Sequence, residues 1–172
     1  MHSDLKGMID DVVFNIRVGV ILEHQDEVLI EISKVGSNSV IPGGRIKTYE
    51  TSVNAIKREV MEELGYDLDE NKLKFIKVLE NLFEFEGHKV HELFFVYKYL
   101  VDDKEYDDLK AIKNNKDNDS TYFEFININD IDKVNLLPLT IERNESYNNL
   151  IAIISIEIPI SIEKIYSALP CP

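Results

Sequence analysis

The chain has few positive charges for its size. Its 172 residues include 19 Lys and Arg against 32 Asp and Glu, which gives a formal net charge of −13 at pH 7. Because non-specific binding of DNA or RNA needs a basic surface, this balance argues against a nucleic-acid partner. It also disfavours a polyphosphate ligand, unless a cation lies between the carboxylates and the phosphates.

Cysteine and long apolar runs are scarce as well. The one cysteine, Cys171, excludes an intramolecular disulfide and suits a reducing compartment. The first eleven residues lack the apolar segment of a secretory signal. The longest apolar stretch, residues 150–160, contains Glu157 and Pro159 and is too short to span a bilayer. We therefore expect a cytoplasmic protein that has no membrane partner.

The composition is that of one globular domain. Hydrophobic residues make up 44% and charged residues 30% of the chain, and its length suits a single core. We expect this domain to span residues 1–148. The Ile-rich tail, residues 149–172, shows period-two patches and leaves three roles open: an edge strand, a contact in a homodimer, or a disordered segment.

Apolar periodicity predicts the order of the elements. Alternation over residues 12–22 indicates a strand, in which Val18 and Val20 face away from Arg17 and Gly19. A helix is expected from Thr51 or Ser52 to Leu64, with Gly65 at its C-terminal end. The polar stretch 102–120 is expected to be a mobile loop. The other expected elements are a hairpin partner at 28–33, a hairpin around 86–88, a strand at 121–126 and a capped helix within 127–138.

The predicted helix carries an unusual cluster of glutamates. At about 100° per residue, Glu59, Glu62 and Glu63 lie within one arc beside the apolar face. Like charges at these spacings cost roughly 0.2–0.5 kcal/mol a pair, and Arg58, four residues before Glu62, can offset one pair. A solvated acidic face is the simplest explanation. Alternatively, a divalent cation removes the repulsion, since Mg²⁺ and Mn²⁺ prefer oxygen ligands.

The wider spacing resembles the box of the Nudix hydrolases. That box reads G-x5-E-x7-R-E-U-x-E-E-x-G-U, where U is a bulky aliphatic residue. Only the last position departs from it here, because Tyr66 is bulky but not aliphatic. The resemblance implies the Nudix fold, an α/β architecture in which a mixed β-sheet is sandwiched between helices. The matching residues are Gly44, Glu50, Arg58, Glu59, Val60, Glu62, Glu63 and Gly65.

The resemblance implies a metal-dependent enzyme that acts on phosphoric anhydride bonds. Glu59, Glu62 and Glu63 would ligate Mg²⁺ or Mn²⁺, aided by a backbone carbonyl at Gly43 or Gly44. These glycines would also let bare backbone approach the phosphates. Arg58 would orient a box glutamate. Glu50 would brace the loop or a water on the metal, and for both residues an ordinary salt bridge is the alternative.

The general base is open among Glu59, Glu92 and Glu105. Glu59 lies in the box, where Glu63 is also expected to take part in catalysis, and Glu105 lies in the expected loop. Glu92 lies in the apolar segment "VHELFF", where an unpaired buried carboxylate would cost several kcal/mol, so we expect it to meet a metal, a cation or the substrate. Its neighbour His91 would then point to the opposite face of the strand.

The substrate is approached by elimination. The segment "LENLFEF" lacks the proline typical of ADP-ribose pyrophosphatases and the tyrosine typical of diadenosine polyphosphate hydrolases, and the long NADH and coenzyme A motifs are absent. This favours a nucleoside triphosphate or another nucleotide derivative, with an oxidised dNTP as one candidate. Arg17 would contact phosphate or base. Phe83 would stack on the base, although strand aromatics more often belong to a core.

Two other functions compete with hydrolysis. A catalytically inactive Nudix domain could bind a ligand or a protein partner, but such domains are expected to lose box carboxylates, and all are present here. A non-hydrolytic relative such as an isopentenyl-diphosphate isomerase would need a reactive core cysteine, whereas Cys171 is the next-to-last residue of the sequence.

Overall fold

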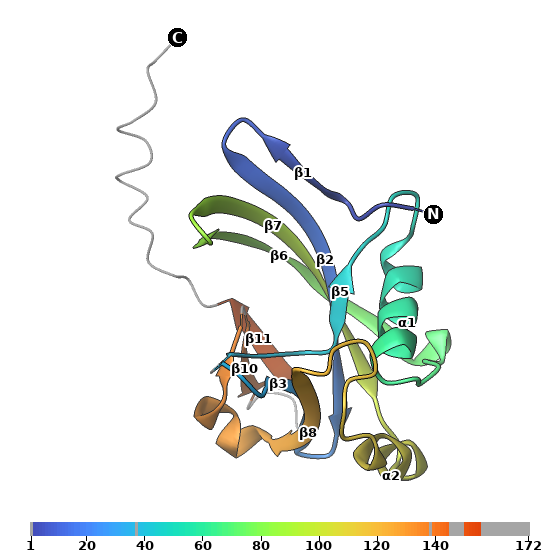
Figure 1. Ribbon diagram of the computed structural model, residues 1–172. Helices are drawn as coiled ribbons and strands as arrows, with labels where there is room; N and C mark the ends of the chain where they lie inside the picture. The colour runs from blue at the N-terminus through green and yellow to red at the C-terminus, as the bar shows by residue number, and fades with distance from the viewer. Residues whose placement is uncertain (1, 37, 138, 145–149, 156–172) are drawn as a thin grey trace.

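A curved mixed β-sheet forms the centre of the protein (Figure 1). The structure is a computed structural model that describes residues 2–36, 38–137, 139–144 and 150–155. Within these residues nine strands form the main sheet and two more form a separate hairpin. The main-sheet strands are β1 (Lys6–Ile9), β2 (Val12–His24), β3 (Glu27–Ser33), β4 (Asn38–Val40), β5 (Gly43–Arg45), β6 (Leu73–Phe85), β7 (His88–Leu100), β8 (Thr121–Asn127) and β9 (Asn135–Leu136).

The long strand β2 organises the sheet. It runs parallel to β7 along its whole length, and the sheet continues in the order β6-β7-β2-β3-β4-β9. β3 pairs with β2 only at Glu23 and His24, at the end of β2. Earlier in β2, at Arg17 to Gly19, the short strand β5 is the antiparallel partner in place of β3. The turn that precedes α1 is therefore held against the middle of β2.

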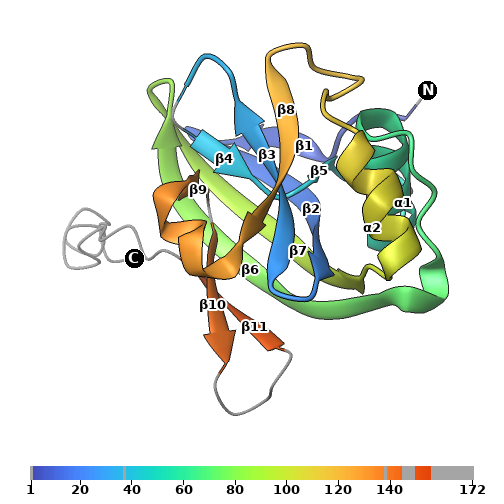
Figure 2. The same cartoon turned by 90° about the horizontal axis from the view of Figure 1, so that it is seen from below.

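Helices cover both faces of this sheet, so the predicted α/β sandwich is confirmed (Figure 2). On one face, α1 (Ser52–Glu63) and α2 (Asp103–Ala111) contribute to a first core with Val18 and Val20. On the other face, the 3-10 helix η2 (Ile128–Lys133) contributes to a second core with Phe94 and Leu79. A short 3-10 helix, η1 (Glu70–Lys72), precedes β6.

Most of the elements expected from periodicity are confirmed. The strand at 12–22 is β2, which extends to His24, and both hairpins form, with Glu86 and Gly87 in the second turn. The residue alternation is also as expected, because Val18 and Val20 belong to the first core. The helix from Ser52, capped by Thr51, ends within one residue of the prediction.

One prediction is wrong and another holds in part. The stretch 102–120 is not simply a loop, because it contains α2, whose first turn is closed by a capping box between Asp102 and Glu105. The expected helix after Asn127 is present and capped by that residue, but it is the short 3-10 helix η2, followed by β9.

Part of the tail pairs with the preceding segment. β10 (Leu139–Asn144) and β11 (Leu150–Ser155) form an antiparallel hairpin apart from the main sheet. Residues 156–172 lie outside the described residues. The domain boundary at residue 148 stays a prediction.

Candidate active site

Helix α1 presents its acids to the turn that leads into β5. Ile56, Val60 and Leu64 are fully buried in the first core, as the sequence predicts. The hydroxyl of Thr51 accepts the amide hydrogen of Asn54 at 3.2 Å and so caps the helix. Because the apolar side is fixed in the core, the neighbouring arc with its glutamates is held over Gly43 and Gly44.

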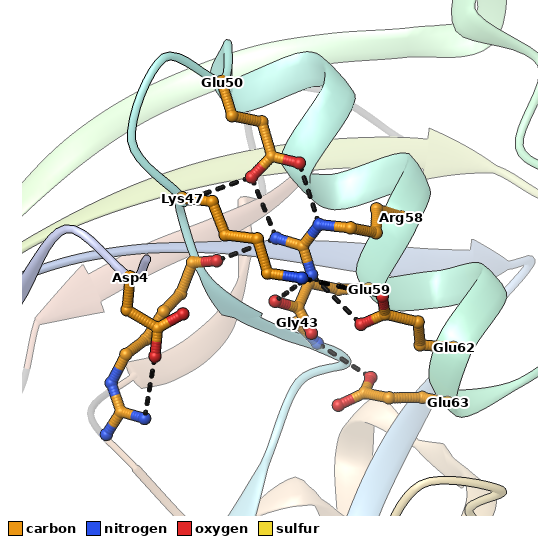
Figure 3. A network of polar contacts seen from close by, with 9 residues as sticks. Asp4, Gly43, Lys47, Glu50, Arg58, Glu59, Glu62 and Glu63 are labelled. Atoms are coloured by element: carbon orange, nitrogen blue, oxygen red, sulfur yellow. Dashed lines mark hydrogen bonds and ion pairs between the residues drawn. The ribbon is translucent and has the colours of Figure 1, made fainter. Parts of the chain in front are cut away.

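Arg58 is the hub of the site (Figure 3). Its Nε and Nη2 donate to the two oxygens of Glu50 at 2.8 and 2.9 Å. Its Nη1 donates to Glu59 at 2.8 Å and to Glu62 at 3.0 Å, so the predicted pair four residues apart is confirmed. Nη2 also donates to the carbonyl of Arg45 at 2.9 Å. One guanidinium thus binds three carboxylates, and its positive charge offsets much of the repulsion among them.

Gly43 and Gly44 let the other carboxylates approach the backbone. The amide nitrogen of Gly43 donates to Glu63 at 3.2 Å, and its φ of 149° lies in a region that side chains rarely adopt. A Cβ on Gly43 would lie 2.2 Å from the carbonyl oxygen of Val18. A Cβ on Gly44 would lie 2.3 Å from the carboxyl carbon of Glu59. Larger residues would therefore displace either the backbone or the acid.

Burial sets the electrostatics of these acids. It raises the pKa of Glu63 to about 9, with further contributions from the charges of Glu31 and Glu59. Burial also raises the pKa of Glu59, although Arg58 opposes this. By contrast, the hydrogen bonds from Arg58 hold the pKa of Glu50 below its usual value. The amide of Gly43 and the charge of Arg17 oppose the rise in the pKa of Glu63 only in part, whereas Glu50 is bonded directly to the guanidinium of Arg58.

Sequence reasoning missed Glu31, a buried acid of β3 that acts on Glu63. The consecutive residues Asn115 and Lys116 link the segments that carry the two acids. Nδ2 of Asn115 donates to the carboxylate of Glu31 at 2.8 Å, and the main-chain amide of Lys116 donates to the main-chain carbonyl of Glu63 at 2.8 Å. Glu31 interrupts the apolar segment "VLIEIS", the same signal that drew attention to Glu92.

The donor set suits Mg²⁺ or Mn²⁺. The acids near the turn offer oxygen ligands, and Glu63, only 8% exposed, accepts a hydrogen bond from Gly43 and keeps lone pairs for another partner. In the part of the chain that the structure describes, no three acidic, His or Cys side chains already converge on one metal position. Arg58 holds Glu59 and Glu62, whereas Glu63 turns to Gly43. Metal binding would therefore take over part of the role of Arg58.

Three of the other candidate residues lie on the opposite face of the sheet, although the charge of Arg17 still acts on Glu63. Arg17 of β2, Glu92 of β7 and Phe83 of β6 share that face because they alternate with first-core residues along their strands. Glu92 is buried, as expected, but its hydrogen bonds come from the neutral amides of Asn15 and Asn81 and not from a cation. His91 points to the other face and contacts Glu80 at 2.8 Å.

Glu105 lies apart from the box glutamates, at the start of α2. It accepts hydrogen bonds from Tyr99 at 2.6 Å, Lys72 at 2.5 Å and the amide of Asp102 at 2.9 Å. Tyr66, the residue that departs from the box pattern, packs against the first core, and burial together with the charge of Glu105 raises the pKa of its hydroxyl.

Comparison with known proteins agrees with this geometry. The NUDIX domain model matches residues 13–150, well over half of the chain. A MutT NUDIX hydrolase from Burkholderia pseudomallei superimposes with a TM-score of 0.52 at 16% identity, covering 67% of this chain and 84% of that one. A MutT protein from Bacillus halodurans gives 0.54 at 17% identity, covering 71% and 74%. No curated protein matches the chain in sequence.

These matches define the class of the protein. The curled mixed sheet with its covering helices is the fold shared with the two solved structures. The chain belongs to the Nudix family, whose hydrolases act on phosphoric anhydride bonds in small nucleotide derivatives. Among the described residues no helix has the length and apolar character needed to cross a membrane.

Proposed function

We propose that the protein is a metal-dependent pyrophosphohydrolase that cleaves a nucleoside diphosphate linked to another moiety. The substrate would be a nucleoside triphosphate or another nucleotide derivative, and an oxidised dNTP belongs to this class. The main support is that Glu63 and Glu59 lie against the bare backbone of Gly43 and Gly44, with Arg58 holding Glu62 beside Glu59.

The three glutamates and a carbonyl of Gly43 or Gly44 would hold Mg²⁺ or Mn²⁺. The ion supplies Lewis-acid polarisation of the phosphoryl oxygens and offsets the negative charge of the protein. Arg58 keeps Glu59 and Glu62 in place, while Glu50 fixes Arg58 and accepts the amide hydrogen of Lys47 at 2.9 Å. This network orients the acids before the substrate arrives.

We assign the general base to Glu59. Of the three candidates, it is the one that presses on Gly44, where the phosphates would approach. Glu92 and Glu105 are engaged with other partners, at the opposite face of the sheet and at the start of α2. Proton transfer requires the base to lie within hydrogen-bonding reach of the attacking water, so position is the first criterion for choosing among the three glutamates.

A substrate panel tests the proposal. Purified protein with Mg²⁺ is expected to release phosphate or pyrophosphate from at least one nucleotide, sugar nucleotide or dinucleotide. Glu63→Gln should abolish this release, because it removes a charged ligand while keeping the shape. Glu70→Gln is the matched control, since Glu70 is exposed at η1 and pairs only loosely with Lys57, at 4.0 Å. It should leave the rate unchanged.

Inactivity of both wild type and Glu63→Gln across the whole panel would refute hydrolysis. The catalytically inactive Nudix domain that binds a ligand or partner would then replace it. We further place the protein in the cytoplasm, because its single cysteine suits a reducing compartment.

A further inference from the structure

Two buried carboxylates lie near the end of α1, and only one of them belongs to the box. Glu31 of β3 is 7% exposed, and Glu63 of α1 is 8% exposed. Glu31 faces the first core and α1, because its strand neighbours Ile30 and Ile32 pack in the second core. After burial, the charge of Glu31 contributes most to the raised pKa of Glu63. The two carboxylates therefore lie close enough to repel each other.

Glu31 and Glu63 flank the glycine turn. Glu31 pairs with Val40 of β4, and only two residues separate Val40 from Gly43. The amide of Gly43 donates to Glu63 at 3.2 Å, and Figure 3 shows this carboxylate beside Gly43 and apart from the guanidinium of Arg58. The strand and the helix thus each bring one acid to the same turn.

Asn115 fixes Glu31 in this position. It is 3% exposed, and its Nδ2 donates to Glu31 at 2.8 Å. Its Oδ1 accepts the main-chain amides of Asp117 at 2.8 Å and Asn118 at 3.1 Å, so the loop sets the orientation of the side-chain amide. An ionised carboxylate offers about four acceptor positions, so Glu31 can still accept a further partner.

The hydrogen-bond donors to these two acids are neutral. Asn115 holds Glu31 and the amide of Gly43 holds Glu63, whereas the other acids of the site share the guanidinium of Arg58. The charge of Arg17 also acts on Glu63, but more weakly than the opposing charge of Glu31. Two neighbouring buried carboxylates are unfavourable unless a cation lies between them.

We propose that Glu31 is a further carboxylate of the metal centre, which binds the ion together with Glu63, and that Asn115 positions it. This inference rests on the proposed function for the ion itself. Glu31 lies outside the box, so the box spacing assigns it no role. Oxygen ligands from a strand and a helix around one bare turn suit Mg²⁺ or Mn²⁺. In the described residues the acids do not already converge on one position, so the ion would draw the two carboxylates toward it.

Calorimetric titration with Mn²⁺ tests this without any substrate. Glu31→Gln should raise the Kd by about 10- to 100-fold, as expected for a residue that binds or orients a metal. The Gln side chain can still accept the hydrogen bond from Asn115, so the loss of charge is separated from the loss of that contact. Glu27→Gln is the matched control, because Glu27 lies on the same face of β3, about 13 Å away, where it binds Tyr106. Its Kd should equal that of wild type.

Asn115→Asp separates a role at the metal from a structural one, and it also gives a readout if Glu31→Gln does not fold. An Asp side chain can keep the two hydrogen bonds to its own loop, but it sets a third carboxylate against Glu31. The metal-free variant should therefore unfold at a lower temperature than wild type, while Mn²⁺ should raise its midpoint by more than in wild type. If Asn115 and Glu31 only hold the loop, the variant would lose stability without any gain in the Mn²⁺ shift.

The outcomes separate this inference from the proposed function. Wild-type Mn²⁺ affinity in Glu31→Gln, equal weakening in Glu27→Gln, or no Mn²⁺ binding by wild type would overturn the role of Glu31. Hydrolysis of a panel substrate, with unchanged Mn²⁺ binding in Glu31→Gln, would leave the proposed function intact. Weakened Mn²⁺ binding in Glu31→Gln, with no hydrolysis of any panel substrate by wild type, would support the role of Glu31 and refute the enzyme.

Discussion

Replacing Gly44 by Ala should remove activity while sparing the fold. The new Cβ would lie 2.3 Å from the carboxyl carbon of Glu59, whereas ordinary contacts begin near 3.4 Å. The difference, 3.4 − 2.3, requires a shift of about 1 Å. The atoms that must move are the far end of a flexible side chain, so Glu59 can swing away without disturbing the backbone.

The expected cost is mostly catalytic. A misplacement of about 1 Å can lower a rate by about 100-fold, which corresponds to about 2.7 kcal/mol of transition-state stabilisation. For the folding free energy, Ala gains about 0.4–1 kcal/mol by restricting the unfolded chain, and weakening the Arg58–Glu59 pair loses up to about 1 kcal/mol. The two terms nearly cancel.

Gly43→Ala is the contrasting control. Its Cβ would meet the backbone oxygen of Val18 at 2.2 Å, and the φ of 149° is unsuitable for alanine. We expect it to destabilise the protein by about 2 kcal/mol or more. The assays are kcat/KM on the best panel substrate and urea unfolding without metal. The reasoning is refuted if Gly44→Ala retains wild-type activity, or if it destabilises the protein as much as Gly43→Ala does.

Three further outcomes follow from the same contacts. Arg58→Lys should lower the free energy of unfolding by about 1–3 kcal/mol, because an ammonium cannot replace the forked bonds to Glu50; a urea midpoint equal to wild type would contradict this. Burial alone would raise the pKa of Glu105, but the bonds from Lys72 and Tyr99 outweigh it and hold that pKa below its usual value. The stability that Glu105 adds is therefore complete above its unfolded pKa of about 4.3 and is lost as the pH falls through its lower folded pKa. The difference in unfolding free energy between wild type and Glu105→Gln should shrink from pH 7 to pH 3, and a constant difference would argue against it. Mn²⁺ at about 100 times its Kd should stabilise wild type by about 2.7 kcal/mol and Glu63→Gln much less, as measured by thermal unfolding.

The box predicted the acids of the site and Arg58 beside them, but not the contacts that hold Arg58 itself. Fixed spacing on a helix is local information, so Glu59, Glu62 and Glu63 could be placed on one arc from the sequence alone. The contacts of Arg58 with Glu50 and with the carbonyl of Arg45 depend on how the turn folds back over the helix. That path is set by the pairing of β5 with β2, which no local pattern encodes.

Helix α2 was missed because composition outweighed a local signal. The segment after Asp102 is rich in charge and poor in apolar residues, which favours a loop. Yet Asp102 and Glu105 have the spacing of a capping box, and the fully buried Leu109 anchors the helix in the first core. One apolar anchor and a good cap were enough, since tertiary contacts stabilise most short helices.

A buried acid in an apolar strand proved to be an informative signal, and the strand period explains why it appears twice. Glu31 lies on the same face of β3 as Leu29, which belongs to the first core, and it therefore acts on Glu63. Glu92 lies on the opposite face and is held by Asn15 and Asn81. Both acids accept hydrogen bonds from neutral amide side chains, which do not balance a negative charge. Each face of the sheet therefore carries one buried carboxylate that is held by amides. Because Glu31 acts on Glu63 and Glu92 lies on the other face, Glu31→Gln should weaken Mn²⁺ binding in a calorimetric titration, whereas Glu92→Gln should leave it unchanged. Equally weakened Mn²⁺ binding in both variants would show that the two faces are not separate.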